Sequence, residues 1–282
     1  MAAKCEVLKW PSSKEVYLTL DLECDYGTAL RKNTYEAASE IRKLIELLNR
    51  LEVPLTCFVQ TELLEELPEA VEELRVADAS VEFFPHSHTH KRREDTSIRR
   101  EVAVSSERFE DFFGNQPRGY RFPNGNVRSE DYTILAEHGY AFDSSVFPSW
   151  RPGHFNNIDI PLKPFREKDS NIVELPFTVL SERFRIPVSL SYLKLLGRPF
   201  SKLVGARPPS TIIFDFHMHD LVVPTTFSAL PAQYKAVYTR RKFDGLDVLE
   251  TFISGLQDRG YNFGAMSALY RATTNSATEA SR

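Results

Sequence analysis

Three of the seven histidines in this 282-residue chain stand at alternate positions in one short stretch, as His86, His88 and His90. Imidazole is the commonest metal ligand in proteins, and it carries protons near neutral pH. On an extended strand all three rings would face one way, whereas a helical turn would bring His86 and His90 onto one face. Such tracts favour metal binding, although the rings could also serve only as hydrogen-bonding groups at a strand end.

Two carboxylates, Asp21 and Glu23, end a segment in which apolar and polar residues alternate. Residues two apart on a strand point to the same side, and carboxylates this close repel each other unless a cation or proton lies between them. Two histidines and one carboxylate with open positions suit a catalytic zinc or a non-haem iron centre. The second carboxylate would then remain free as a base; the alternative is an exposed acidic turn.

Other titratable side chains follow later apolar segments. One of His217 and His219 could protonate a leaving amine, or both could be ligands or core histidines. Arg121 cannot lose its charge and could orient a carboxylate. Asp143 could orient a histidine or the arginine.

The segments that carry these residues alternate between strand and helix patterns. A long loop is expected at 149–171, and the polar tail over 271–282 is expected to be disordered. Strands are expected at 15–23, 53–60, 81–84, 118–122, 139–143, 171–180, 211–217 and 261–265, and helices at 34–52, 61–77 with a break near Pro68, 97–113, 129–138, 190–205 and 246–258.

Alternating strands and helices predict right-handed βαβ units around a parallel sheet. The candidate residues fall at the carboxyl ends of the strands, which meet at one mouth in a (β/α) barrel, whereas an open sheet would spread them along a crevice. We therefore expect an α/β barrel of seven or eight strands, formed by a single catalytic domain over residues 1–270.

The composition excludes several classes of protein. The chain is 42% hydrophobic and 26% charged, as in ordinary globular proteins. A net charge of -4 argues against a general nucleic-acid binder. We expect no transmembrane segment and no signal peptide, and three widely spaced cysteines suggest a reducing compartment. The expected location is the cytoplasm.

Taken in order, five segments resemble the motifs of the polysaccharide deacetylase family, the NodB-homology domain of carbohydrate esterase family 4. Asp21-Leu22-Glu23 is similar to the first motif, D-x-D/E, and the stretch from His86 to His90 to the second, H-S/T-x-x-H. Residues 119–125 (GYRFPNG) resemble the third, R-x-P-x-G. Residues 140–145 (YAFDSS) resemble the fourth, and His217 or His219-Asp220 the fifth.

The resemblance implies a distorted (β/α) barrel that hydrolyses amides with a divalent metal, usually zinc. It implies that Glu23, His86 and His90 bind the metal and that Asp21 is the general base. The remaining implied roles are general acid for His217 or His219, a hold on Asp21 for Arg121, tuning of its neighbours for Asp143, and substrate binding for Asn124, whose backbone N–H would stabilise an oxyanion, and Gly125.

Several positions depart from the family pattern. Glu23 replaces the second aspartate that many members have, and Cys24 beside it is unusual. Asn124 stands where an aromatic residue is common, so the substrate's shape could differ. The fifth motif fits either His217 or His219, and we favour His217 because it follows the strand directly.

The predicted function is hydrolysis of an N-acyl group, most simply acetyl, from an amino sugar of a cell-surface or lipid-linked glycan. One alternative keeps the fold and changes the substrate to a formyl group or a small amide. Two others change the class: a non-haem iron oxygenase, which the order of the five motifs disfavours, and a non-catalytic sugar-binding barrel, which the presence of Asp21 disfavours.

Overall fold

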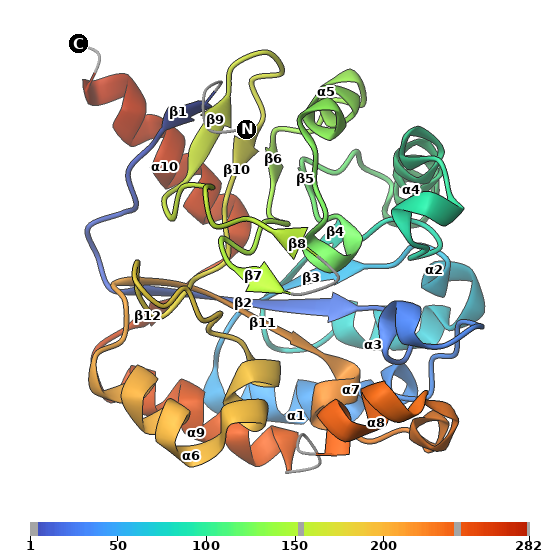
Figure 1. Ribbon diagram of the computed structural model, residues 1–282. Coiled ribbons are helices and arrows are strands. Elements are labelled where there is room, and N and C mark those ends of the chain that lie inside the picture. Colours follow the sequence, from blue (N-terminus) through green and yellow to red (C-terminus); the bar gives the residue numbers. More distant parts are fainter. Residues whose placement is uncertain (1–4, 152–154, 240–243, 281–282) are drawn as a thin grey trace.

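The chain folds into two five-stranded sheets around one interior, one parallel and one mixed, in a computed structural model that describes residues 5–151, 155–239 and 244–280 (Figure 1). A separate antiparallel pair of strands completes the described sheets. The strands are β1 (Cys5–Val7), β2 (Glu15–Leu22), β3 (Leu55–Val59), β4 (Val81–Pro85), β5 (Gly119–Tyr120), β6 (Phe142–Asp143), β7 (Trp150–Arg151), β8 (Phe155–Asn156), β9 (Phe165–Glu167), β10 (Val173–Glu174), β11 (Thr211–His217) and β12 (Asn262–Phe263).

Seven of these strands make up the barrel. Parallel pairing joins β11, β2, β3 and β4 in one sheet and β5, β6 and β10 in the other. The two sheets meet at the Arg121 amide, which donates to Pro85 O at 3.2 Å, and at the Ile213 amide, which donates to Thr178 Oγ1 at 2.8 Å. Because single hydrogen bonds replace continuous ladders at these seams, the barrel is distorted. The predicted fold class is confirmed.

The alternating pattern of β2 separates two environments rather than core from solvent. Val16, Leu18 and Leu20 belong to the buried cluster that packs under the outer helices, whereas Tyr17 belongs to an apolar cluster with residues of both sheets. Thr19 and Asp21 are buried as well. Asp21 therefore projects from the same face as Tyr17, into the barrel interior.

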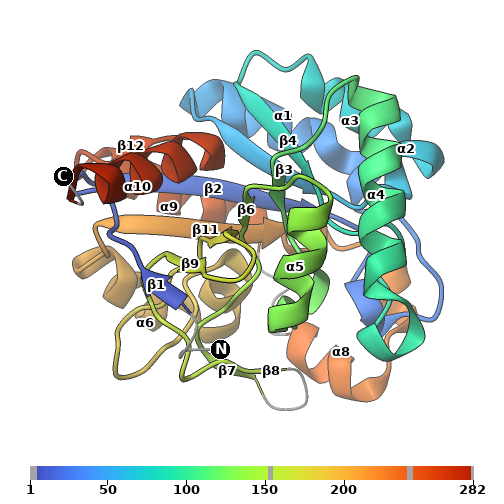
Figure 2. The ribbon, with the colours of Figure 1, turned by 90° about the horizontal axis from the view of Figure 1, so that it is seen from above.

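Helices cover the outside of the strands (Figure 2). As predicted, the chain breaks at Pro68, which begins a new helix, and Gly114 ends another with a φ of 75°. The α-helices are α1 (Ile41–Leu51), α2 (Leu63–Glu66), α3 (Pro68–Arg75), α4 (Ile98–Phe113), α5 (Ser129–Glu137), α6 (Leu190–Ala206), α7 (Met218–Leu221), α8 (Ala232–Thr239), α9 (Gly245–Gln257) and α10 (Met266–Ala280). Among the described helices, none has the length and apolarity to cross a bilayer.

The largest differences from the sequence prediction lie in three segments, besides the shorter β5 and β6 and the additional helix α8. The loop expected at 149–171 contains the short strands β7, β8 and β9, and the strand expected at 171–180 shortens to β10. The tail expected to be disordered from 271 is helical as far as Ala280. Its helix α10 lies at the end of the barrel where β2 begins (Figure 1). It buries Met266 and Leu269, and Tyr270 stacks on Phe142 with ring centroids 5.3 Å apart. This packing offsets the polar composition of the tail.

Candidate active site

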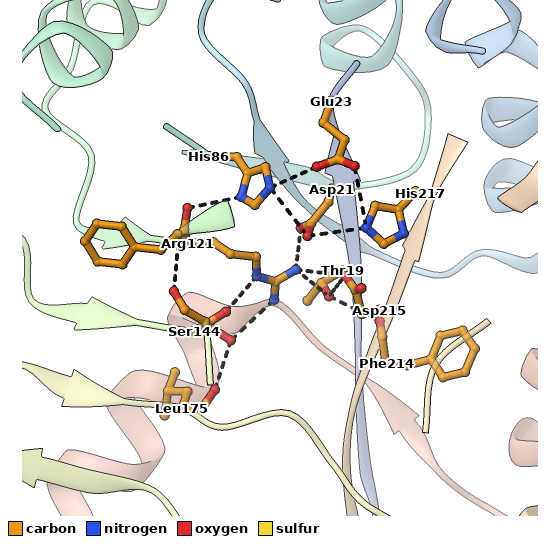
Figure 3. A network of polar contacts seen from close by, with 12 residues as sticks. Thr19, Asp21, Glu23, His86, Arg121, Ser144, Leu175, Phe214, Asp215 and His217 are labelled. Carbon is orange, nitrogen blue, oxygen red and sulfur yellow. Dashed lines mark hydrogen bonds and ion pairs between the residues drawn. The ribbon is translucent and has the colours of Figure 1, made fainter. Parts of the chain in front are cut away.

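Glu23, His86 and His90 converge at the carboxyl ends of β2 and β4. Glu23 directly follows β2, and His86 directly follows β4 (Figure 3). His90 lies four residues further along the same turn. One Glu23 oxygen, Oε2, lies 3.2 Å from His86 Nε2 and also contacts His90 Nε2. All three residues are buried, and one potential ligand atom from each lies within 4.8 Å of the others. The three predicted ligands are thus brought together.

The hydrogen bonding of His86 tests whether these residues suit a metal. Its Nδ1 lies 3.0 Å from the carbonyl oxygen of Arg121, so Nδ1 carries the hydrogen. The Nε2 of a neutral His86 then directs its lone pair at the Glu23 carboxylate, and the two would repel. A cation between them removes the repulsion, and a backbone acceptor on the far nitrogen is the usual support of a metal-bound histidine. The donor set therefore fits a divalent metal such as zinc.

The electrostatics of Glu23 agree with this interpretation. Burial alone would raise its pKa, but the charges of His90 and His217 outweigh burial and hold the pKa of Glu23 well below its usual range. Conversely, burial lowers and Glu23 raises the pKa of His90, with a net increase. The site therefore carries a buried negative charge that favours a bound cation.

Asp21 lies beside this cluster, with its two oxygens in different surroundings. Oδ1 accepts from Arg121 Nη1 at 2.6 Å. Oδ2 faces the cluster, 3.7 Å from His86 Nε2 and 3.9 Å from His217 Nε2 (Figure 3). One oxygen is therefore anchored, and the other is available to accept a proton.

Arg121 is fixed from every side. Its guanidinium lies over the rings of Phe58 and Phe177, 3.9 and 4.4 Å from their centroids. Nε donates to Ser144 O at 2.7 Å, and Nη2 lies 3.3 Å from Ser144 Oγ. A side chain that is 1% exposed and held in this way gives Asp21 a rigid partner.

Asp215 was not predicted as a site residue, yet it shares Nη1 of Arg121 with Asp21, at 3.0 Å. Burial and the nearby Asp21 charge raise the pKa of Asp215 to about 8. Thr19 also accepts from Nη1, at 3.0 Å. The signal in the sequence was an aspartate inside an otherwise apolar strand, because such a residue needs a buried partner.

The structure distinguishes the two candidate acids. His217 Nδ1 donates to Asp220 at 3.1 Å, which turns Nε2 toward Asp21 and Glu23. His219 stacks on His217, with ring centroids 4.8 Å apart, and its Nδ1 accepts the Tyr26 amide. Glu23, Asp215 and Asp220 outweigh burial and raise the pKa of His217 to about 10. His217 therefore holds a proton where it faces the base.

Asp220 is a further residue that the sequence reasoning did not assign. Besides His217, its carboxylate accepts from Ser191 Oγ at 2.7 and 2.8 Å. It is 1% exposed. The sequence did contain a signal, because a histidine followed three residues later by an aspartate can place both on one turn.

Asp143 lies behind the pocket wall, beside Glu174, rather than among the residues that line the pocket. Its Oδ1 accepts from Ser145 Oγ at 2.7 Å. Burial and the Glu174 carboxyl raise the pKa of Asp143 well above its usual range. Two buried carboxyls this close are satisfied when they share one proton. The role predicted for Asp143 is thus indirect, through Ser145, which lines the pocket and accepts the Phe122 amide at 2.7 Å.

One pocket is lined by the base Asp21, by the metal-ligand cluster and by the two candidate acids, His217 and His219. Asn124 and Gly125 line it as predicted, and both have a left-handed backbone, with φ of 61° and 64°. Aromatic side chains form much of the remaining wall: Tyr26, Phe122, Phe147, Phe155, Phe177, Tyr192, Tyr234 and Tyr238.

Comparison with known proteins supports the resemblance seen in the motifs. Residues 9–142 match the family model described as polysaccharide deacetylase. This range includes the first three motifs and reaches into the fourth. A search of curated protein sequences finds no significant match.

Solved structures share the fold at low sequence identity. A Mycobacterium smegmatis protein assigned as a polysaccharide deacetylase has a TM-score of 0.62 at 18% identity, over 95% of this chain and 93% of its own. The peptidoglycan deacetylase PdaC of Bacillus subtilis has a TM-score of 0.55 at 14% identity, over 96% and 97%. A pseudoenzyme of the CE4 family from Bacillus anthracis has a TM-score of 0.55 at 16% identity, over 92% and 66%. Because a pseudoenzyme shares the fold, activity must be argued from the site residues.

Proposed function

We propose that this chain, whose residues 9–142 match the polysaccharide deacetylase family model and whose fold is that of its solved relatives, is a metal-dependent hydrolase. It removes an N-acyl group, most simply acetyl, from an amino sugar of a cell-surface or lipid-linked glycan. The observation that carries the proposal is the placement of Asp21. One oxygen is tied to Arg121, and the other faces both the metal-ligand cluster and His217.

Glu23, His86 and His90 would hold the metal, and zinc fits their donor atoms. A bound divalent metal supplies Lewis-acid chemistry: it lowers the pKa of water to about 7 and polarises a carbonyl. The chain itself contributes a buried carboxylate and two oriented imidazoles, with the His86 tautomer set by the Arg121 carbonyl.

Asp21 and His217 supply the proton transfers. Asp21 Oδ2 takes a proton from the attacking water, while Arg121 keeps Oδ1 from rotating into that position. His217 Nε2 gives a proton to the leaving amine, and Asp220 holds the ring by its other nitrogen. A base and an acid that serve one amide in this way typically contribute 10²–10⁴-fold each. In this mechanism the backbone N–H of Asn124 donates to the oxyanion that develops from the amide carbonyl.

The pocket wall supports a sugar as substrate. Tyr26, Phe147, Tyr234 and Tyr238 line the pocket around the polar cluster. Aromatic faces with a few convergent polar groups are typical of sites for ligands that have both apolar and hydroxylated surfaces. The PdaC relative is a peptidoglycan deacetylase by name, which supports a glycan of that kind.

Acetate release from N-acetylglucosamine oligomers by the zinc-loaded protein tests the proposal. We expect release by the wild type and a loss of at least 100-fold in Asp21→Asn, which keeps the shape of the side chain but removes the base. Formate release from N-formyl sugars without acetate release would reassign the acyl group. Hydrolysis of neither substrate by a zinc-loaded, folded protein would contradict the proposal.

A further inference from the structure

Glu101 is a buried acidic residue that takes no part in the proposed chemistry. It lies in the first turn of α4 and is 6% exposed. Its carboxylate accepts five hydrogen bonds from a neighbouring loop. The donors are Ser87 Oγ at 2.7 Å, His88 N at 3.0 Å, Thr89 N at 2.8 Å, Thr89 Oγ1 at 2.6 Å and Thr96 Oγ1 at 3.0 Å.

The bonded loop is the one that carries the metal-ligand histidines. Four of the five bonds come from Ser87, His88 and Thr89, which are all the positions between His86 and His90. The fifth comes from Thr96, just before α4. Burial alone would raise the pKa of Glu101, but the hydrogen bonds from Thr89 and Ser87 outweigh it and lower the pKa. The loop therefore surrounds an ionised carboxylate.

This loop has an unfavourable backbone conformation. Ser87 has a φ of 65° and His90 a φ of 55°, in the left-handed region that residues with a Cβ seldom occupy. Such conformations persist only where the surroundings over-determine them, and they cluster at functional sites. Three bonds hold the carbonyl oxygens of the loop: Thr61 N donates to Ser87 O at 3.0 Å, Glu62 N to His88 O at 3.1 Å, and Asn33 Nδ2 to Thr89 O at 3.1 Å. The bonds to Glu101 hold its N–H and O–H groups.

The two histidines depend on this loop to different degrees. His86 is also held through Nδ1 by the Arg121 carbonyl. His90 Nδ1 is buried and, within the described part of the chain, has no hydrogen-bond partner. The His90 ring is therefore held by its backbone and by the contact of Nε2 with Glu23, with no support at Nδ1 from the described residues.

We propose that Glu101 is a positioning residue for the metal site: its carboxylate holds residues 87–89 in the conformation that aims His90 at Glu23. The proposal rests on the metal site of the proposed function. It adds a residue outside the five motifs and predicts that metal affinity depends on a side chain that contacts no ligand atom.

The first test is zinc affinity, measured by competition with a chromophoric chelator. Glu101→Gln loses the charge and turns one acceptor oxygen into an amide that faces N–H donors. We expect zinc to bind it 10–100-fold more weakly than the wild type, the usual cost of losing an outer-shell partner. The control is Glu107→Gln, an exposed glutamate of the same helix, which should bind as the wild type does. A Glu101→Gln affinity within threefold of the wild type would overturn the proposal.

A second measurement does not depend on metal binding. Amide hydrogen exchange of the metal-free protein should be at least tenfold faster across residues 86–92 in Glu101→Gln, with the rest of α4 unchanged. Ser87→Ala removes one of the donors to Glu101 and should show a smaller increase in the exchange rate. This milder variant keeps the proposal testable if Glu101→Gln does not fold. If the wild type bound no zinc, the proposed function would fail, whereas unchanged exchange in both variants would refute the role of Glu101.

Discussion

Replacement of Arg121 by lysine tests whether a rigid guanidinium is required to hold the base. A lysine ammonium can replace Nη1, which contacts Asp21 and Asp215, but it cannot also reach Ser144. Two hydrogen bonds from a charged group are then lost, each worth about 1.5–3 kcal/mol. The Ser144 carbonyl is left unsatisfied, and the stacking on Phe58 and Phe177 is weakened.

We expect Arg121→Lys to lower the free energy of unfolding by about 4 kcal/mol. With an unfolding entropy of about 2.1 cal/mol/K per residue, this corresponds to a fall in Tm of roughly 7 °C. Because an Asp21 displaced by about 1 Å costs roughly 100-fold in rate, kcat should fall by about that factor with little change in KM. Calorimetry and acetate release measure the two effects. The control is Arg99→Lys, at an exposed pair with Glu137, which should change neither. A variant within 2 °C and threefold of the wild type would refute the reasoning.

Three further predictions concern other parts of the site. Gly27→Ala would place a Cβ 3.0 Å from His90 Cε1 and 3.3 Å from Glu23 Oε1, at a φ of 52°, so zinc affinity should fall at least tenfold in the chelator assay. His217→Gln should lower kcat at least 100-fold while His219→Gln lowers it less; the reverse order would reassign the acid. Raised pKa values of Asp143 and Glu174 mean that the folded state binds more protons than the unfolded state. The contribution of this pair to the free energy of unfolding therefore falls as pH rises above about 4. In Asp143→Asn the amide supplies the shared hydrogen permanently, and calorimetry should therefore show its Tm rising relative to the wild type between pH 5 and pH 8; parallel curves would contradict the shared proton.

Much of the barrel could be predicted because the local patterns were strong. The segment 211–217 is apolar and β-branched, and β11 has those bounds. The Pro68 break followed from backbone chemistry alone, and the helix expected at 97–113 ends at Phe113 as α4 does. The lengths of the short strands β5, β6 and β10 were overestimated. The apolar residues that flank them are buried, but they lie outside the regular strands.

The predicted ligands and base were identifiable because their spacing and their order along the chain are specific. The residues that support them were not, since Asp215, Asp220 and Glu101 acquire their roles only through contacts made by the fold. The helix α10 was missed for a similar reason. Its polar composition suggested disorder, but one apolar stripe is buried at the end of the barrel.

The central claim is that Glu23, His86 and His90 hold a metal on which amide hydrolysis depends. The most direct test strips the protein with a chelator, measures acetate release from N-acetylglucosamine oligomers, and then restores one equivalent of zinc. The account predicts one zinc per chain, no release from the stripped protein and recovery on reconstitution, with His86→Ala failing to recover. Undiminished acetate release by the metal-free protein, or a folded wild type that binds no zinc, would contradict it.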